Sequence, residues 1–406
     1  MFLKISKQKI YFFLEYCLAM VLILDINCVW IRKYELGDDF FTYITLIIEV
    51  LVFLFEGVNI KRKDLIPLSL LNVFVLISGA THGIGIKSLV LIGIPFSLSY
   101  LLIRHFSYVN HDIIGKITNL VTIIAAISLV FYFFGSILGV IPGKTISSFH
   151  WGYDVEANSY FDIYYESQGA MKMFSNAEYV RNCALFCEAP MYAFLLAICF
   201  GYELLIREKR NTVKLTVLFI TCITTTSSTG IVGLFMTLLF FSIIKFRDKK
   251  TNKTIRIILL LSLPTIFVTC ISICYYMFVA KMTIRSLSYS ARMDDLRACF
   301  QVFLSSPLWG CGVRYYNSII SHLSMINRSS TGMSSGLFVM LAQTGVALVI
   351  WPIIKVLRCK YSIKEYCYFM LFIFLFMFTN IPYKCIIIFI LYPILLNNRN
   401  NKGSFQ

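Results

Sequence analysis

The sequence predicts an all-α integral membrane protein with about twelve transmembrane helices and two long extracytoplasmic loops. Three observations favour this fold class. The chain of 406 residues is 58% hydrophobic and only 14% charged, whereas a soluble domain carries about 25% charged residues. Its apolar residues form runs long enough to cross a bilayer, and its basic residues form short clusters between those runs. We therefore expect a single transmembrane domain over residues 1–406.

The apolar runs set the expected positions of the helices, because a spanning helix needs about 20 mostly apolar residues. We expect spans near residues 10–30, 40–59, 65–80, 85–103, 117–141, 184–205, 214–227, 229–245, 257–279, 335–354, 365–379 and 382–396. Two segments that would lie outside the membrane are much longer than the other connections, residues 142–182 and residues 281–334. Long loops on a rigid scaffold often carry function.

The basic clusters predict the orientation, because cytoplasmic loops are enriched in Lys and Arg. Clusters follow the second, sixth and eighth expected spans, at 61–63, 207–214 and 247–256. With all clusters on the cytoplasmic side, both termini lie in the cytoplasm. The net charge of +16 therefore indicates membrane topology, and we expect no nucleic-acid partner.

The apolar run from Val213 to Phe246 is too long for one span and short for two. Both of its ends are basic, and its centre, Thr224–Gly230, is rich in Thr and Ser. We predict two short helices joined by a tight turn that contains Gly. The alternative is one long tilted helix, which would leave one basic flank outside.

The segment 142–182 is acidic and rich in aromatic residues, including His150 and Trp151. Aromatic faces pack on the apolar faces of sugars, and carboxylates accept hydrogen bonds from hydroxyls. This composition favours a carbohydrate-binding loop. The alternative is an aromatic belt at the membrane interface.

The segment 281–334 is basic although the topology places it outside. Five of its six cations are Arg, and only Asp294 and Asp295 oppose them. The planar fork of Arg binds phosphate oxygens in pairs, so we expect an anionic substrate here. The alternative is a solvated basic loop on anionic lipid headgroups. Within it, Ser290 to about Leu304 predicts an amphipathic helix on the membrane surface.

Glu188 is a carboxylate inside a strongly apolar run, and an ionisable residue there is costly and points to function. Arg181 precedes it by about two helical turns, so both would face one cavity if the segment is helical. The alternative is a structural ion pair between helices.

Three stretches resemble the bacterial polysaccharide polymerase family, the O-antigen and capsule polymerases related to the O-antigen ligases. Arg181–Pro190 resembles the family's Arg…Gly-x-Phe-x-Glu-Pro signature, although Ala184 stands where Gly is common and Ala189 separates Glu188 from Pro190. Thr224–Gly230 resembles its Thr/Ser-rich break. Ser290 to Gly312 resembles its Ser-x-Arg…Ser-Pro-Leu-x-Gly-x-Gly signature. The ligases usually carry a His-Asn pair where Ser334-Ser335 stands here, which favours polymerase over ligase.

The resemblance implies a GT-C-like architecture and a reaction. A growing glycan would be transferred from undecaprenyl pyrophosphate to a hydroxyl of another lipid-linked repeat unit, at the outer face of the bacterial cytoplasmic membrane. Arg181, Arg292 and Arg314 would bind the pyrophosphate. Glu188 is the first candidate for the proton acceptor, followed by Asp295 and then His322.

The resemblance also implies partners. They are the lipid-linked oligosaccharide substrate, membrane lipids, a chain-length regulator and a flippase, and no metal or nucleotide cofactor is expected. Two other functions stay open, a ligase-like glycan transferase and a flippase or other transporter. A flippase should carry its charges within the spans rather than in two outer loops.

Overall fold

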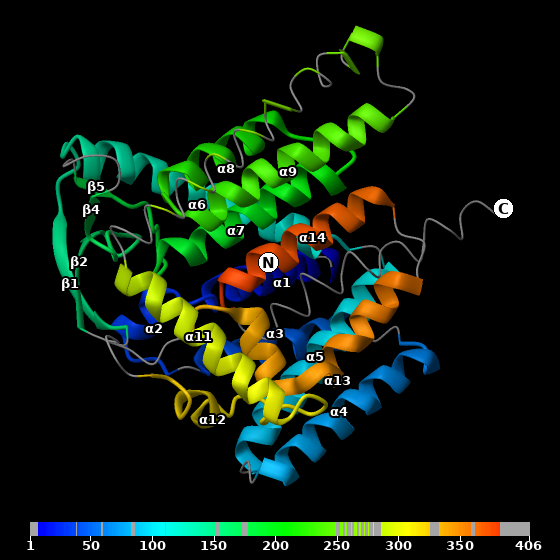
Figure 1. The fold of residues 1–406 in the computed structure, drawn as a ribbon. Coiled ribbons are helices and arrows are strands. Elements are labelled where there is room, and N and C mark those ends of the chain that lie inside the picture. The colour runs from blue at the N-terminus through cyan, green and yellow to red at the C-terminus, as the bar shows by residue number, and fades with distance from the viewer. Residues whose placement is uncertain are drawn as a thin grey trace, which may run out of the picture.

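The computed structural model describes residues 7–37, 39–57, 60–82, 86–109, 111–151, 154–172, 178–248, 286–324, 333–358 and 362–381, with a few isolated positions between 252 and 279. Helices make up most of it (Figure 1). The first half contains α1 (Lys7–Leu24), α2 (Val29–Lys33), α3 (Phe40–Glu56), α4 (Arg62–His82), α5 (Ile86–Val109) and α6 (Ile113–Val130). The second half contains α7 (Ala189–Gly201), α8 (Thr212–Thr224), α9 (Ser228–Arg247), α11 (Ser286–Ser305), α12 (Asn317–Ile320), α13 (Gly336–Arg358) and α14 (Ile363–Phe378). Two π-helical segments, η1 (Phe131–Ile137) and η2 (Tyr202–Ile206), continue α6 and α7.

The predicted number of spans is wrong for the part of the chain that the structure describes. Four helical stretches there are long and apolar enough to cross a membrane, at Asp64–Thr81, Ile113–Ile137, Ala189–Ile206 and Ser228–Arg247. Several expected spans form shorter helices. For example, the 17 residues of α3 extend only about 26 Å, against a hydrocarbon core of about 30 Å. The expected spans at 257–279 and 382–396 lie largely or wholly outside the described residues.

The expected span at 335–354 is broken inside α13. Gly345 has φ +59° and ψ −159°, so two helical pieces meet there at a kink. The loop of residues 307–312 crosses the kink, where Val346 N donates to Pro307 O at 2.9 Å and Cys311 N donates to Ala342 O at 2.8 Å. A Cβ on Gly310 would lie 2.3 Å from the Gln343 carbonyl carbon, so only glycine permits this approach.

The Thr224–Gly230 stretch does separate two helices, which confirms the paired-helix prediction over one long helix. The turn is Thr225, Thr226 and Ser227, with Thr226 at φ +50°, while Gly230 lies inside α9. Asn182 N donates to Thr224 O at 3.1 Å, and Arg181 Nε donates to Thr225 O at 2.9 Å. The carbonyl groups freed by the break are therefore paired with protein, as an apolar environment requires.

The described chain is mostly helical, as predicted, but segment 142–182, which was expected to be a loop, forms short antiparallel strands. They are β1 (Lys144–His150), β2 (Asp154–Tyr160), β3 (Tyr164–Tyr165), β4 (Ala170–Lys172) and β5 (Glu178–Val180). The first three form one sheet in the order β1-β2-β3, with Lys144 opposite Tyr160 and His150 opposite Asp154. Ser147 and Phe149 are buried while Ser148 and His150 are exposed, and this period of two is that of a strand.

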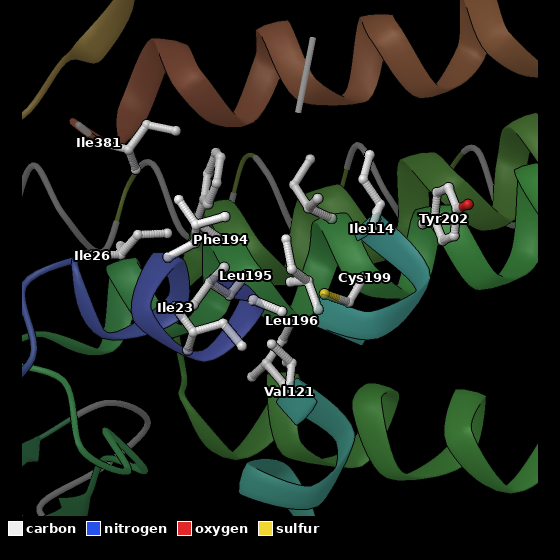
Figure 2. Packing of buried hydrophobic residues seen from close by; sticks show 14 of the residues in the cluster. Ile23, Ile26, Ile114, Val121, Phe194, Leu195, Leu196, Cys199, Tyr202 and Ile381 are labelled. Carbon is white, nitrogen blue, oxygen red and sulfur yellow. The ribbon is translucent and has the colours of Figure 1, made fainter. Parts of the chain in front are cut away.

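The core centres on α7, which packs against α6, α8, α9 and α14. Figure 2 shows Leu195 and Leu196 of α7 among Ile23 of α1 and Val121 of α6. A second buried cluster joins α11 to α13 through Ala298, Cys299 and Val339. The N-terminal end of α7 lies between these packed elements and the β-sheet, and the candidate site forms there.

Candidate functional site

A cavity of about 510 Å³ opens where seven segments of the sequence meet. These are the α1–α2 region, the end of β1, the start of α7, α11 with α12, and the ends of α13 and α14. Its charged and ionisable side chains are Arg32, His150, Glu188 and Arg292. Trp151, Tyr316 and Phe378 contribute aromatic surface. The wall therefore combines cations, one carboxylate and aromatic faces.

Glu188 is held at the N-terminal end of α7. It is the residue that caps this helix, with extended φ −140° and ψ 141°, and Pro190 follows in the first turn. Proline at that position fixes the helical start. Trp151 Nε1 donates a hydrogen bond of 2.8 Å to Glu188 Oε1. This bond fixes one oxygen of a carboxylate that lines the cavity.

Arg32 is a cavity residue that sequence reasoning missed. Its guanidinium carbon lies 5.3 Å from the centroid of the Trp151 ring, a cation–π contact. Backbone bonds position α2 here, because Val29 N donates to Leu185 O at 2.9 Å and Cys187 N donates to Asn27 O at 3.0 Å. A signal was available. Arg32 and Lys33 follow the first expected span on its outer side, where basic residues are least expected.

Arg292 approaches the cavity from α11. Among the residues that the structure describes, it has no ion-pair partner, and it forms no ion pair with Asp295 one turn away. Asp295 is buried, and its Oδ2 accepts hydrogen bonds from Ser334 N at 2.9 Å and Ser334 Oγ at 2.6 Å. Ser334 lines the cavity. Asp295 therefore shapes the wall through Ser334.

Arg181 does not line the cavity with Glu188, although the spacing predicted a shared face. Residues 181–188 are not helical, so the helical period does not apply to them. Besides Thr225 O, its guanidinium donates to Gln168 Oε1 at 2.7 Å. The same Gln168 oxygen accepts from Ala189 N at 3.2 Å. Arg181 thus connects the α8–α9 turn to the residue after Glu188.

Arg314 and His322 also lie away from the cavity lining. Arg314 Nη1 pairs with Asp39 Oδ1 at 2.9 Å, just before α3. His322 is exposed, and its Nδ1 lies 2.8 Å from Ser318 O, so that nitrogen donates to the carbonyl. Of the six candidates, the structure brings Glu188 and Arg292 into one cavity, with Asp295 behind its wall.

An ion pair fixes the β-sheet to α2 beside the cavity. Lys33 Nζ pairs with Asp162 Oδ1 at 2.5 Å, Tyr34 OH donates to Asp162 Oδ2 at 3.0 Å, and Trp30 Nε1 donates to Asp162 O at 2.8 Å. The hydrogen bond from Lys33 is the main influence that lowers the pKa of Asp162, followed among the lowering effects by the bond from Tyr34. Lys33 Nζ also donates to Ser147 Oγ of β1 at 3.2 Å, so the clamp holds the strand that leads to His150 and Trp151.

The cavity can bind an anion and can accept a proton, because two guanidinium groups and one carboxylate share its wall. Within the described ranges, no group of three His, Cys, Asp or Glu side chains is placed to hold a metal ion. Comparison of the chain with protein-family models, curated proteins and solved structures found no match.

Proposed function

We propose that this protein is a polysaccharide polymerase of the cytoplasmic membrane of bacteria, which transfers a glycan from a lipid pyrophosphate to another lipid-linked repeat unit. The observation that carries the proposal is the composition of one cavity. Arg292 and Arg32 stand in the same wall as Glu188 and Trp151. A lipid-linked sugar pyrophosphate needs cations for its phosphates, aromatic faces for its sugars and a base for the acceptor hydroxyl.

The chemistry is a glycosyl transfer. The acceptor oxygen bonds to the anomeric carbon of the donor while the bond from that carbon to the pyrophosphate oxygen breaks. Glu188 takes the proton of the acceptor hydroxyl, and the electron pair leaves with the pyrophosphate. Arg292 and Arg32 stabilise the negative charge that gathers on the leaving group. Trp151 holds the Glu188 carboxylate in place through its indole N–H.

The orientation follows from the two ends of α7. The basic cluster Arg207, Lys209 and Arg210 follows η2 at one end, and Glu188 stands at the other. Basic clusters mark the cytoplasmic side. The cavity therefore opens at the outer face, and lipid-linked repeat units reach it after a flippase has delivered them. No metal or nucleotide takes part.

Removal of the protein from its host, followed by analysis of glycan length, tests the reaction. Loss of a polymerase leaves single repeat units on the outer face, on their lipid or on the final acceptor. Full-length polymers that stay on their lipid carrier would identify a ligase instead. Absence of any repeat unit outside would identify a flippase. Either of these two results would overturn the proposal.

Arg292→Lys tests the phosphate contact, because it keeps the charge and loses the planar fork. We expect about a tenfold or greater fall in polymer formation by the purified protein on lipid-linked repeat units. Arg297→Lys is the matched control, since Arg297 lies on the same helix and is exposed. Equal activity of both variants would show that Arg292 does not bind the phosphate through its planar fork.

A further inference from the structure

Five exposed apolar side chains lie on the segments that meet at the open end of the β1–β2 hairpin, where Lys144 pairs with Tyr160. We call this group the hairpin edge, and it consists of Leu138, Val140, Ile146, Phe161 and Ile163. Ile146 is 73% exposed and Phe161 is 61% exposed, although both lie in the segment that the sequence places outside the membrane. Side chains of this size are costly to leave in water when they form a contiguous surface.

The hairpin edge lies beside the end of a candidate membrane span. That span covers Ile113–Ile137, and Leu138 and Val140 follow directly. The rings of Phe161 and Phe131 are 6.1 Å apart. Phe131 is the first residue of η1, six residues inside the end of the span. Phe161 is therefore level with residues of the span rather than beyond its end.

The exposed face of the hairpin changes in polarity with distance from the span. Lys144 and Ile146 lie at the near end, while Ser148, His150 and Asp154 follow toward the far end. Asp154 is 97% exposed. An apolar near end and a polar far end match the change from hydrocarbon through headgroups to water.

Tyrosine residues hold the near end of the hairpin against the span. Tyr132 of η1 forms a buried cluster with Tyr160 and Tyr164, and Ser136 Oγ donates to Tyr164 OH at 3.3 Å. Tyrosine is enriched at the membrane–water interface, where its ring is in an apolar layer and its hydroxyl can reach polar partners. The hairpin is therefore fixed against the end of the span by these tyrosine contacts.

We propose that the hairpin edge is a lipid-binding surface, which inserts into the boundary between headgroups and acyl chains of the adjoining leaflet. Its occupant is lipid, because the surface continues the outward side of the span, where Ile127, Val130 and Phe134 are exposed. Lys144 at the edge is half-exposed, and its Nζ lies 3.6 Å from Glu166 Oε2. His150 of the cavity is four positions along β1 from Ile146, about 13 Å along the strand. Insertion of the edge thus keeps the cavity close to the lipid surface.

Tryptophan fluorescence in vesicles with brominated lipids tests this, because bromine on the acyl chains quenches only nearby indoles. The pair is Ile146→Trp and Asp154→Trp, which stand at the two ends of the same exposed face, each corrected for the emission of the wild-type protein. We expect brominated lipid to reduce the added emission of Ile146→Trp about twofold and to leave that of Asp154→Trp unchanged.

Both replaced side chains are largely exposed, so the variants should keep the fold, and elution in detergent checks this. Phe161→Trp provides a second reading at the same depth and should also be quenched. Equal emission of Ile146→Trp in brominated and ordinary lipid would overturn the proposal. Emission that depends on protein concentration rather than on bromine would assign the surface to a second copy of the chain, and would overturn it as well.

Discussion

Two apolar stretches of this protein have the composition of membrane spans but different surroundings. In Ile113–Ile137, formed by α6 and η1, only 28% of the most apolar part is buried inside the protein. In Ala189–Ile206, formed by α7 and η2, 89% is buried. The first stretch thus turns most of its surface outward, and the second is a core helix. Apolar composition identifies both stretches as candidate spans. It does not distinguish the side chains that face outward from those that pack against protein.

Small residues account for the deep burial of α7. Ala189, Ala193, Ala197 and Gly201 recur every four residues along one side of the helix. Opposite them, α9 carries Gly230, where an added Cβ would lie 2.6 Å from Ala193 Cβ. Small residues allow helix backbones to approach closely in an apolar environment. The central position of α7 therefore depends on this match of small side chains.

The inner side of α6 packs through polar contacts. Lys116 pairs with buried Glu15 of α1, and His111 Nδ1 lies 3.0 Å from the other oxygen of Glu15. Further along, Ser128 Oγ lies 2.9 Å from Tyr192 OH of α7. The outer side of α6 carries exposed Ile123 and Ile127. Specific bonds therefore orient α6, whereas α7 is held by packing on all sides.

The largest expected effect concerns the end of α7 at the cavity. Glu188→Gln removes the proposed proton acceptor and keeps the size of the side chain, so polymer formation should fall by about 10²–10⁴-fold. The measurement is the rate of chain growth with purified protein and lipid-linked repeat units. Glu156→Gln is the control, because Glu156 is an exposed carboxylate on β2 away from the cavity. A full rate in Glu188→Gln would exclude this residue as the base.

The next effect concerns the inner side of α6. Lys116→Met leaves the buried Glu15 carboxylate without its lysine partner, and such a loss costs about 3–5 kcal/mol of unfolding free energy. Denaturant unfolding in detergent measures the change. The double variant Lys116→Met with Glu15→Leu should recover much of the loss, because no charge is then left buried. If Lys116→Met alone is as stable as the wild-type protein, polar contacts do not orient α6.

A smaller effect tests the packing of α7. Gly230→Val places two methyl groups where a single Cβ already meets Ala193, and overpacking costs about 1–3 kcal/mol. The control is Ile127→Val on α6, an exposed position where we expect less than about 0.5 kcal/mol. Thermal unfolding in the same detergent compares them. Equal melting temperatures for both variants would show that the contacts of α7 and α6 tolerate substitution equally well. That result would contradict the difference in burial between the two stretches.

The sequence could predict the apolar helices and the break at Thr224–Gly230, because each depends on local composition. It could not predict how the charges pair. The period of a helix placed Arg181 beside Glu188, but residues 181–188 follow an irregular path fixed by bonds to 27–29 and to the α8–α9 turn. Arg32 lines the cavity because the same long-range bonds position α2. The strands of 142–182 were not predicted, because the alternation in Lys144–His150 covers only seven residues and the strand forms by pairing with β2.

The smallest expected effect concerns the clamp that holds the β-sheet beside these helices. Because Lys33 lowers the pKa of Asp162 below its ordinary 3.8, the ion pair stabilises the fold at neutral pH, and this contribution is lost as the pH falls through the lowered pKa. Lys33→Met should cost about 0.2–1 kcal/mol at pH 7, since the pair is partly exposed. At a pH below the lowered pKa, the variant and the wild-type protein should become equally stable, because Asp162 is then protonated in both. Unfolding curves between pH 7 and that acid limit measure the difference. A gap that stays constant across this range would mean that Lys33 acts through packing on Tyr165 rather than through the charge of Asp162.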